Sequence, residues 1–178
     1  MRLVDGEGLK GNFVQFRHLA GFVKPIRSKG EFYLLPGVGL IWQTVSPVSS
    51  RMIIDEGTVT HSMGGDVVSR ISIQQFPALK VLKAALENSL AGNWEYLETL
   101  AGESLKKTQE TWTLRYEPKV ENGKTVFREV LFVIGDYLER AEILKDEGDT
   151  DIILFSNQTV LPKEEILPQF KAGGEADK

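Results

Sequence analysis

The sequence predicts a mainly β protein of the α+β class: a strongly curved antiparallel sheet or barrel with a helix on its concave face. Short runs of aromatic and β-branched residues alternate with turn residues, as in antiparallel sheets and barrels. One stretch has helical periodicity instead. About ten strands would make a flat sheet ~48 Å wide, whereas a helix of about 13 residues is only ~20 Å long. One helix cannot cover such a sheet, so the sheet must curl.

Six short strands are predicted in the first 73 residues. Pro36-Gly37 and Gly64-Gly65 lie between apolar runs, which is typical of hairpin turns. The segment 18–29 contains Gly21 and Pro25 and is predicted to be a turn or an irregular edge. The six predicted strands are 11–17, 30–35, 39–45, 51–55, 58–61 and 67–73.

The period changes between Ala78 and Leu90, where leucines recur at intervals of three, four and four residues. This spacing places them on one face of a helix. Pro77 suits the first turn of that helix, and Gly92 ends it. The face of this helix that is expected to lie over the sheet therefore carries Leu79, Leu82 and Leu86.

Strand patterns return after the helix. Apolar and polar residues alternate from Trp112 to Tyr116, as in a half-buried strand. Asn122-Gly123 is a strong hairpin turn because both residues tolerate positive φ angles. No linker or repeat divides the chain, so residues 1–171 are expected to form a single domain and residues 172–178 a disordered tail. The predicted strands of this half are 111–116, 125–134, 137–145 and 150–155.

The composition excludes several classes of protein. The chain has 178 residues, of which 42% are hydrophobic and 26% charged, as expected for one globular domain. Its net charge of -4 argues against a nucleic-acid partner, which would require a basic stripe. The absence of cysteine excludes disulfides, thiol catalysis and thiolate metal sites. No stretch approaches the ~20 apolar residues of a spanning helix.

The sequence contains no recognisable catalytic or metal-binding motif. His18 and His61 have no second ligand at metal spacing and are interpreted as turn or surface histidines. The expectation is a protein with no cofactor, no metal and no catalytic residue, with an enzyme that uses strand-borne carboxylates as an alternative. Four acidic residues gather around one turn without calcium-loop spacing, and a solvated hairpin tip is the better interpretation. These residues are Asp146, Glu147, Asp149 and Asp151.

Large apolar residues occupy alternate positions of the predicted strands, so each set faces one side of the sheet. They form either an ordinary core or the lining of an apolar cavity, because one helix leaves part of the concave face uncovered. These residues are Phe32, Leu34, Leu40, Trp42, Trp112, Leu114, Phe132 and Ile134.

Three runs of the sequence resemble the periplasmic outer-membrane lipoprotein carrier proteins, the LolA-like family. They are G-N-F-V-Q-F-R, then S-K-G-E-F-Y-L-L-P-G-V-G-L-I-W-Q-T-V-S-P, then M-I-I-D-E-G. The likeness extends over roughly residues 11 to 165 and is most specific in its first part. The family elements correspond in this chain to Phe13 and Gln15, Gly30 and Phe32, Trp42, Pro47, and Ile53 to Gly57.

The resemblance implies an incomplete, strongly curved antiparallel β-barrel with a helical lid on its concave face, which binds the acyl chains of lipoproteins and carries them across the periplasm. The protein is expected to be a monomer. An inner-membrane releasing complex and an outer-membrane acceptor are the implied partners. Buried methylene groups, each worth about 0.8 kcal/mol, would supply the driving force. The residues expected to contact lipid are Phe32, Leu34, Leu40, Trp42, Ile53, Leu79, Leu82, Leu86, Trp112 and Leu114.

Two features depart from the family pattern. Residues 1–10 are too short and glycine-rich for the usual N-terminal helix, and no arginine stands near Pro36 to fasten the lid. The cargo could accordingly be a glycolipid or a polyene-type lipid. Two further alternatives stay open, namely an interaction or assembly module of the same fold with a filled core, and an enzyme on a barrel scaffold.

Overall fold

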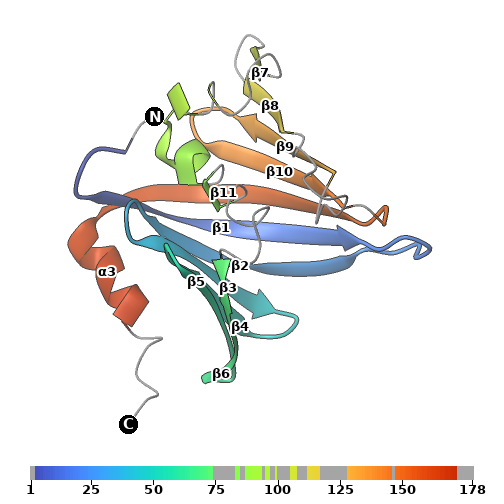
Figure 1. Cartoon of the computed structure of the whole chain (residues 1–178), viewed down its shortest axis with the longest axis horizontal. Coiled ribbons are helices and arrows are strands. Elements are labelled where there is room, and N and C mark those ends of the chain that lie inside the picture. Colours follow the sequence, from blue (N-terminus) through green and yellow to red (C-terminus); the bar gives the residue numbers. More distant parts are fainter. Residues whose placement is uncertain are drawn as a thin grey trace.

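The computed structural model describes residues 3–73, 83–84, 87–93, 95–96, 99, 105–107, 112–116, 128–145 and 147–171. Within these residues one antiparallel sheet of eleven strands forms the body of the protein (Figure 1). The expected tail, residues 172–178, lies outside the described residues.

The first half of the chain is a meander of six strands in which each strand pairs with the next. All six predicted strands are confirmed. The predicted turn or irregular edge at 18–29 is confined to residues 19–25, because strand pairing continues to His18 on one side and begins again at Ile26 on the other. The six strands are β1 (Glu7–His18), β2 (Ile26–Leu35), β3 (Gly39–Ser46), β4 (Ser50–Ile54), β5 (Thr58–Met63) and β6 (Asp66–Ser72).

The second half supplies five more strands. The short strand β7 was not predicted, and β11 continues seven residues beyond the predicted end at Phe155, to Pro162. The predicted turn at Asn122-Gly123 lies outside the described residues. The strands are β7 (Leu105–Lys107), β8 (Trp112–Tyr116), β9 (Glu129–Ile134), β10 (Leu138–Leu144) and β11 (Thr150–Pro162).

The strand order is β6-β5-β4-β3-β2-β1-β11-β10-β9-β8-β7. The first and last strands, β1 and β11, therefore lie side by side in the middle of the sheet, as Figure 1 shows. The chain leaves the sheet at one edge, β6, and re-enters it at the other edge, β7. Because β6 and β7 are at opposite ends of the order, the barrel is incomplete, as predicted.

The described helical residues between β6 and β7 lie against one face of the sheet, which we call the inner face. Residues 83–84 and 87–91 are helical, within the predicted helix and one residue past its end. Leu90 is 3% exposed and belongs to the same apolar cluster as the sheet residues. The backbone N–H of Leu3 donates to the carbonyl of Ala91 at 3.0 Å, which fixes the end of this helical turn.

The inner face carries the main apolar core. Alternation along the strands directs one set of side chains to it, and most of that set is fully buried. The central members are Leu9 and Phe13 of β1, Phe32 and Leu34 of β2, Leu40 of β3, Phe132 and Ile134 of β9, Ala141 of β10, and Ile153 and Phe155 of β11.

A helix that the sequence analysis did not predict, α3 (Lys163–Lys171), packs on the opposite, outer face. Its Ile166 is fully buried beside Gly8, where an added Cβ would strike the isoleucine. The guanidinium of Arg51 in β4 donates to the carbonyl of Gln169 at the C-terminal end of α3. Glu164 and Glu165 in the first turn and Lys171 in the last favour this helix, but Pro168 within it is unfavourable.

The turn between β4 and β5 depends on one carboxylate. Asp55 accepts hydrogen bonds from the backbone N–H groups of Gly57 (2.8 Å) and Thr58 (2.6 Å) and from the Thr58 hydroxyl (2.8 Å). We expect Asp55→Ala to lower the free energy of unfolding by about 1–2 kcal/mol, measured by urea denaturation. Asp66→Ala, at an exposed aspartate, is the control; an equal loss in both variants would contradict this role for Asp55.

The same turn should make the stability of the protein depend on pH. Partial burial alone would raise the pKa of Asp55, but the three hydrogen bonds outweigh it, and Lys83 adds to them, so the pKa lies below its usual value. A lowered pKa in the folded state stabilises the protein above the unfolded-state pKa of about 3.9, and this contribution is lost as the pH falls through the folded-state value. The stability difference between the native protein and Asp55→Asn should therefore shrink below about pH 4. A stability difference between the two proteins that stays constant with pH would contradict this prediction.

Candidate functional site

A cavity of about 230 Å³ opens on the inner face. Its lining comes from both halves of the sheet: Met52 and Ile54 belong to β4, whereas Ala141 and Ile143 belong to β10. These strands are five places apart in the order, which would separate them by ~24 Å in a flat sheet. One small cavity can touch both only because the sheet is strongly curved. The lining residues are Gln15, Arg17, Leu40, Trp42, Met52, Ile54, Ala141, Ile143, Asp151 and Ile153.

Aromatic rings pack together beside the cavity. The ring of Trp42 stacks on Phe13 with centroids 3.9 Å apart and planes inclined by 25°. Phe155 meets Trp42 edge to face at 6.0 Å and Phe32 at 5.6 Å. Each contact limits the freedom of the indole, because aromatic pairs prefer these offset and edge-to-face arrangements. Trp42 is therefore a fixed wall of the cavity.

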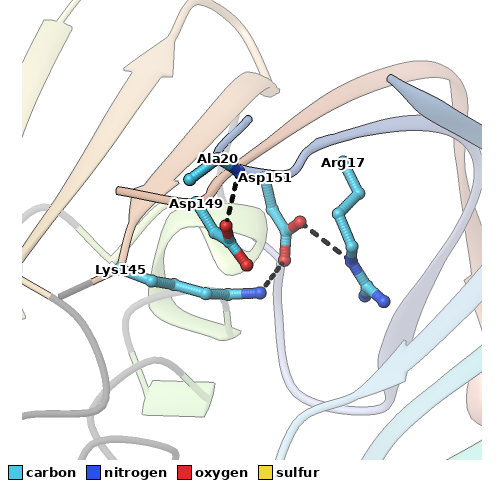
Figure 2. A network of polar contacts seen from close by, with 5 residues as sticks. All are labelled: Arg17, Ala20, Lys145, Asp149 and Asp151. Atoms are coloured by element: carbon cyan, nitrogen blue, oxygen red, sulfur yellow. Dashed lines mark hydrogen bonds and ion pairs between the residues drawn. The ribbon is translucent and has the colours of Figure 1, made fainter. Parts of the chain in front are cut away.

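Arg17 and Asp151 form a polar end of the cavity, and Figure 2 shows their polar contacts. Asp151 is 5% exposed and receives two cations. The Nε of Arg17 lies 3.1 Å from its Oδ1, and the Nζ of Lys145 lies 2.8 Å from its Oδ2. Nearby, the backbone N–H of Ala20 donates to Asp149 at 2.9 Å. These contacts join the end of β1 to the turn between β10 and β11.

The pairing of β1 with β11 builds this cluster. The register places Arg17 directly opposite Asp151, and both residues point to the inner face. The interpretation of this acidic turn as a solvated hairpin tip is therefore wrong for Asp151, whose burial is compensated by its two ion pairs. Asp149 is bonded to Ala20, Glu147 is exposed, and Asp146 lies outside the described residues.

Residues 1–159 match the family model described as outer membrane lipoprotein carrier protein LolA-like. The chain belongs to this family. A search of the curated proteins found no match.

Three solved structures resemble this LolA-like chain at low sequence identity. A LolA superfamily protein from Nitrosomonas europaea is 9% identical, with 93% of this chain and 91% of that one covered and a TM-score of 0.43. A candidate outer membrane lipoprotein-sorting protein domain from Vibrio parahaemolyticus is 10% identical, with coverages of 94% and 92% and a TM-score of 0.41. A DUF1329 family protein from Desulfovibrio piger is 11% identical, with coverages of 86% and 85% and a TM-score of 0.35.

Four of the residues expected to contact lipid lie on the inner face of the LolA-like sheet. Leu40 and Trp42 line the cavity. Phe32 and Leu34 are completely buried in the core around it. Ile53 lies on the outer face, because it pairs with Ile41 while its neighbours Met52 and Ile54 line the cavity. The expectation for Ile53 is thus corrected.

The other predicted lipid contacts are less fully described. Leu79, Leu82 and Leu86, the expected underside of the lid, lie outside the described residues. The backbone register of β8 places Trp112 opposite Ile134 and Leu114 opposite Phe132, both of which are buried inner-face residues of β9.

Several cavity residues were missed by sequence reasoning. Ile54 was missed because the run Arg51 to Ile54 has apolar residues in both phases of the strand, and only the pairing of Met52 with Trp42 decides between them. Ala141 was not predicted as a cavity residue because its small side chain does not stand out in a hydrophobic pattern. Arg17 and Asp151 are polar, and no local pattern places them opposite each other.

Within the described residues, no group of three or more histidine, aspartate or glutamate side chains is placed to hold a metal ion. His18 is exposed and His61 partly exposed. No described helix is long and apolar enough to cross a membrane.

Proposed function

We propose that this LolA-like protein is a non-catalytic periplasmic carrier. It holds an acyl chain of a lipoprotein, or of a related lipid, in the inner-face cavity and carries it toward the outer membrane. The observation that supports this proposal is an apolar cavity walled by Leu40, Trp42, Ile54, Ile143 and Ile153 inside a curved sheet. Such concave apolar sites with a few polar groups are where small amphiphilic ligands bind.

The size of the cavity suggests how cargo is held. Ligand sites commonly enclose about 300–1,000 Å³, so a cavity of about 230 Å³ accommodates part of one acyl chain. At about 0.8 kcal/mol per buried methylene, even a partly buried chain is retained. A cargo with several chains would require the helical segment to move away from the sheet. Partial burial also favours release, which a carrier must achieve.

Exchange of cargo requires a donor and a recipient. On the basis of family membership we propose an inner-membrane releasing complex as the donor and an outer-membrane acceptor as the recipient. We propose further that the carrier itself acts as a monomer.

Native mass spectrometry of the freshly purified protein tests the proposal, together with titration by the neutral fluorescent probe N-phenyl-1-naphthylamine. We expect co-purified lipid, and saturable probe binding that long-chain lipids displace. A protein that carries no lipid and binds no probe would contradict the carrier function and favour an interaction module with a filled core.

A further inference from the structure

We propose that the cargo is an amphiphile with an anionic head group, and that the cluster of Arg17, Lys145 and Asp151 binds that head group at the polar end of the cavity. This inference rests on the proposed carrier function and specifies the chemistry of its cargo. It predicts that the carrier discriminates between lipids by head-group charge and not by chain length alone.

The charge balance of the cluster favours an anion. Two cations, Arg17 and Lys145, converge on the single carboxylate of Asp151. These three residues sum to a formal charge of +2 − 1 = +1, and the carboxylate of Asp149 in the same network instead accepts from the backbone N–H of Ala20. The buried carboxylate of Asp151 thus holds two cations beside the cavity. Fixed charge beside a low-dielectric wall acts more strongly on a ligand than the same charge in open water.

The geometry leaves Arg17 able to bind a second anion. Only its Nε bonds to Asp151, and Figure 2 shows the two terminal nitrogens directed away from that carboxylate. Within the described part of the chain, neither terminal nitrogen has a hydrogen-bond partner. The side chain is 48% exposed, so solvent and ligand can reach it. Two neighbouring terminal NH2 groups without a partner among the described residues suit the paired oxygens of a carboxylate or phosphate.

The apolar wall of the cavity and its charged end are continuous. Along β11, Ile153 and Asp151 are adjacent inner-face positions, and Ile143 of β10 is paired with Asp151. An alkyl chain lying between Ile143 and Trp42 would therefore place its head group at Arg17. A cluster that only holds β1 against β11 would not favour an anionic head group over a neutral one. Binding experiments with both kinds of ligand therefore separate the two roles.

Displacement of bound N-phenyl-1-naphthylamine by three matched C14 amphiphiles tests the inference at pH 8. The competitors are tetradecanoic acid, tetradecyl phosphate and tetradecanol, each used below its aggregation concentration. We expect the preferred anionic competitor to bind at least about tenfold more tightly than the alcohol, a factor equivalent to about 1.4 kcal/mol. Whichever of the two anionic competitors binds more tightly assigns the head group as a carboxylate or a phosphate.

Arg17→Gln should reduce that preference to about twofold or less while tetradecanol binds as before. Lys145→Gln provides a second variant of the same cluster. Arg27→Gln is the matched control, because Arg27 is an exposed cation of β2 that pairs with Phe16 outside the cavity. Added salt should weaken the preference in the native protein, since an exposed ion pair is screened.

Equal displacement by all three competitors in the native protein would overturn the anionic-head-group inference and leave the carrier function intact. So would an undiminished preference in both folded variants. Failure of the native protein to bind the probe would instead contradict the carrier function.

Discussion

Gly30→Ala is expected to lower the free energy of unfolding by about 3 kcal/mol or more, a large effect for the addition of a single methyl group. Gly30 lies on the inner face of β2, opposite Phe13 of β1. A Cβ at this position would overlap the carbonyl oxygen of Gln43 in β3 and approach the Cζ of Phe13 to 2.8 Å. The first clash involves backbone, so no rotamer change relieves it.

The consequence extends to the cavity. Because Gly30 has no side chain, the ring of Phe13 can lie over the strand and stack on Trp42. Displacing Phe13 would therefore disturb the wall formed by Trp42 as well as the pairing of β2 with β3. The variant should lose probe binding at temperatures where it is still largely folded.

Urea denaturation monitored by circular dichroism measures the effect. Gly57→Ala is the matched control, because a Cβ there would meet only the carboxylate of Asp55, at 3.9 Å. We expect the control to change stability by less than about 1 kcal/mol, since it adds the same methyl group without a clash. A Gly30→Ala protein as stable as Gly57→Ala would show that β2 and β3 can separate at little cost.

Local patterns were sufficient to predict most of the sheet. Turn residues such as Pro36-Gly37 and Gly64-Gly65 separate short apolar runs, and both pairs form hairpin turns in the structure. Gly37, Gly64 and Gly65 have φ angles of 74°, 62° and 95°, a region that glycine adopts without strain. Adjacent antiparallel strands joined by such turns are local structures, so the sequence near each turn is enough to predict them.

The pairing of β1 with β11 could not be predicted in this way. These strands are separated by more than a hundred residues, and nothing near either one specifies its partner. That single pairing extends β1 to His18, places Arg17 opposite Asp151 and closes the polar end of the cavity. The charged part of the candidate site therefore depends on long-range contacts, whereas its apolar part follows partly from alternation.

The phase of a strand is another property that local sequence leaves open. In Arg51 to Ile54, two adjacent isoleucines give each face of the strand an apolar side chain, so the sequence does not show which face is inner. The prediction that Ile53 contacts lipid was wrong, because the pairing of Met52 with Trp42 directs Ile53 to the outer face. The helix α3 was missed for a different reason. Pro168 within it argues against a helix, but burial of Ile166 against the sheet and the hydrogen bond from Arg51 to Gln169 stabilise it.

Ala141→Phe is expected to weaken binding of the apolar probe by at least about tenfold, because the added ring takes up space that the ligand needs. Ala141 is completely buried, lines the cavity and lies on β10 opposite Ile153. Its small side chain is one reason that space remains between β4 and β10. Overfilling a well-packed core costs about 1–3 kcal/mol, but a ring that enters a cavity of about 230 Å³ should cost less.

Fluorescence titration measures the affinity, and thermal unfolding measures the stability of the same preparation. Ala20→Phe is the control, because Ala20 is exposed in the β1–β2 turn and only its backbone N–H bonds to Asp149. This variant should bind the probe like the native protein. If Ala141→Phe folds and still binds with native affinity, ligand occupies another part of the molecule. Loss of binding in a folded variant of equal or greater stability would instead place the ligand where β4 and β10 face each other, a site that exists only because the sheet is curved.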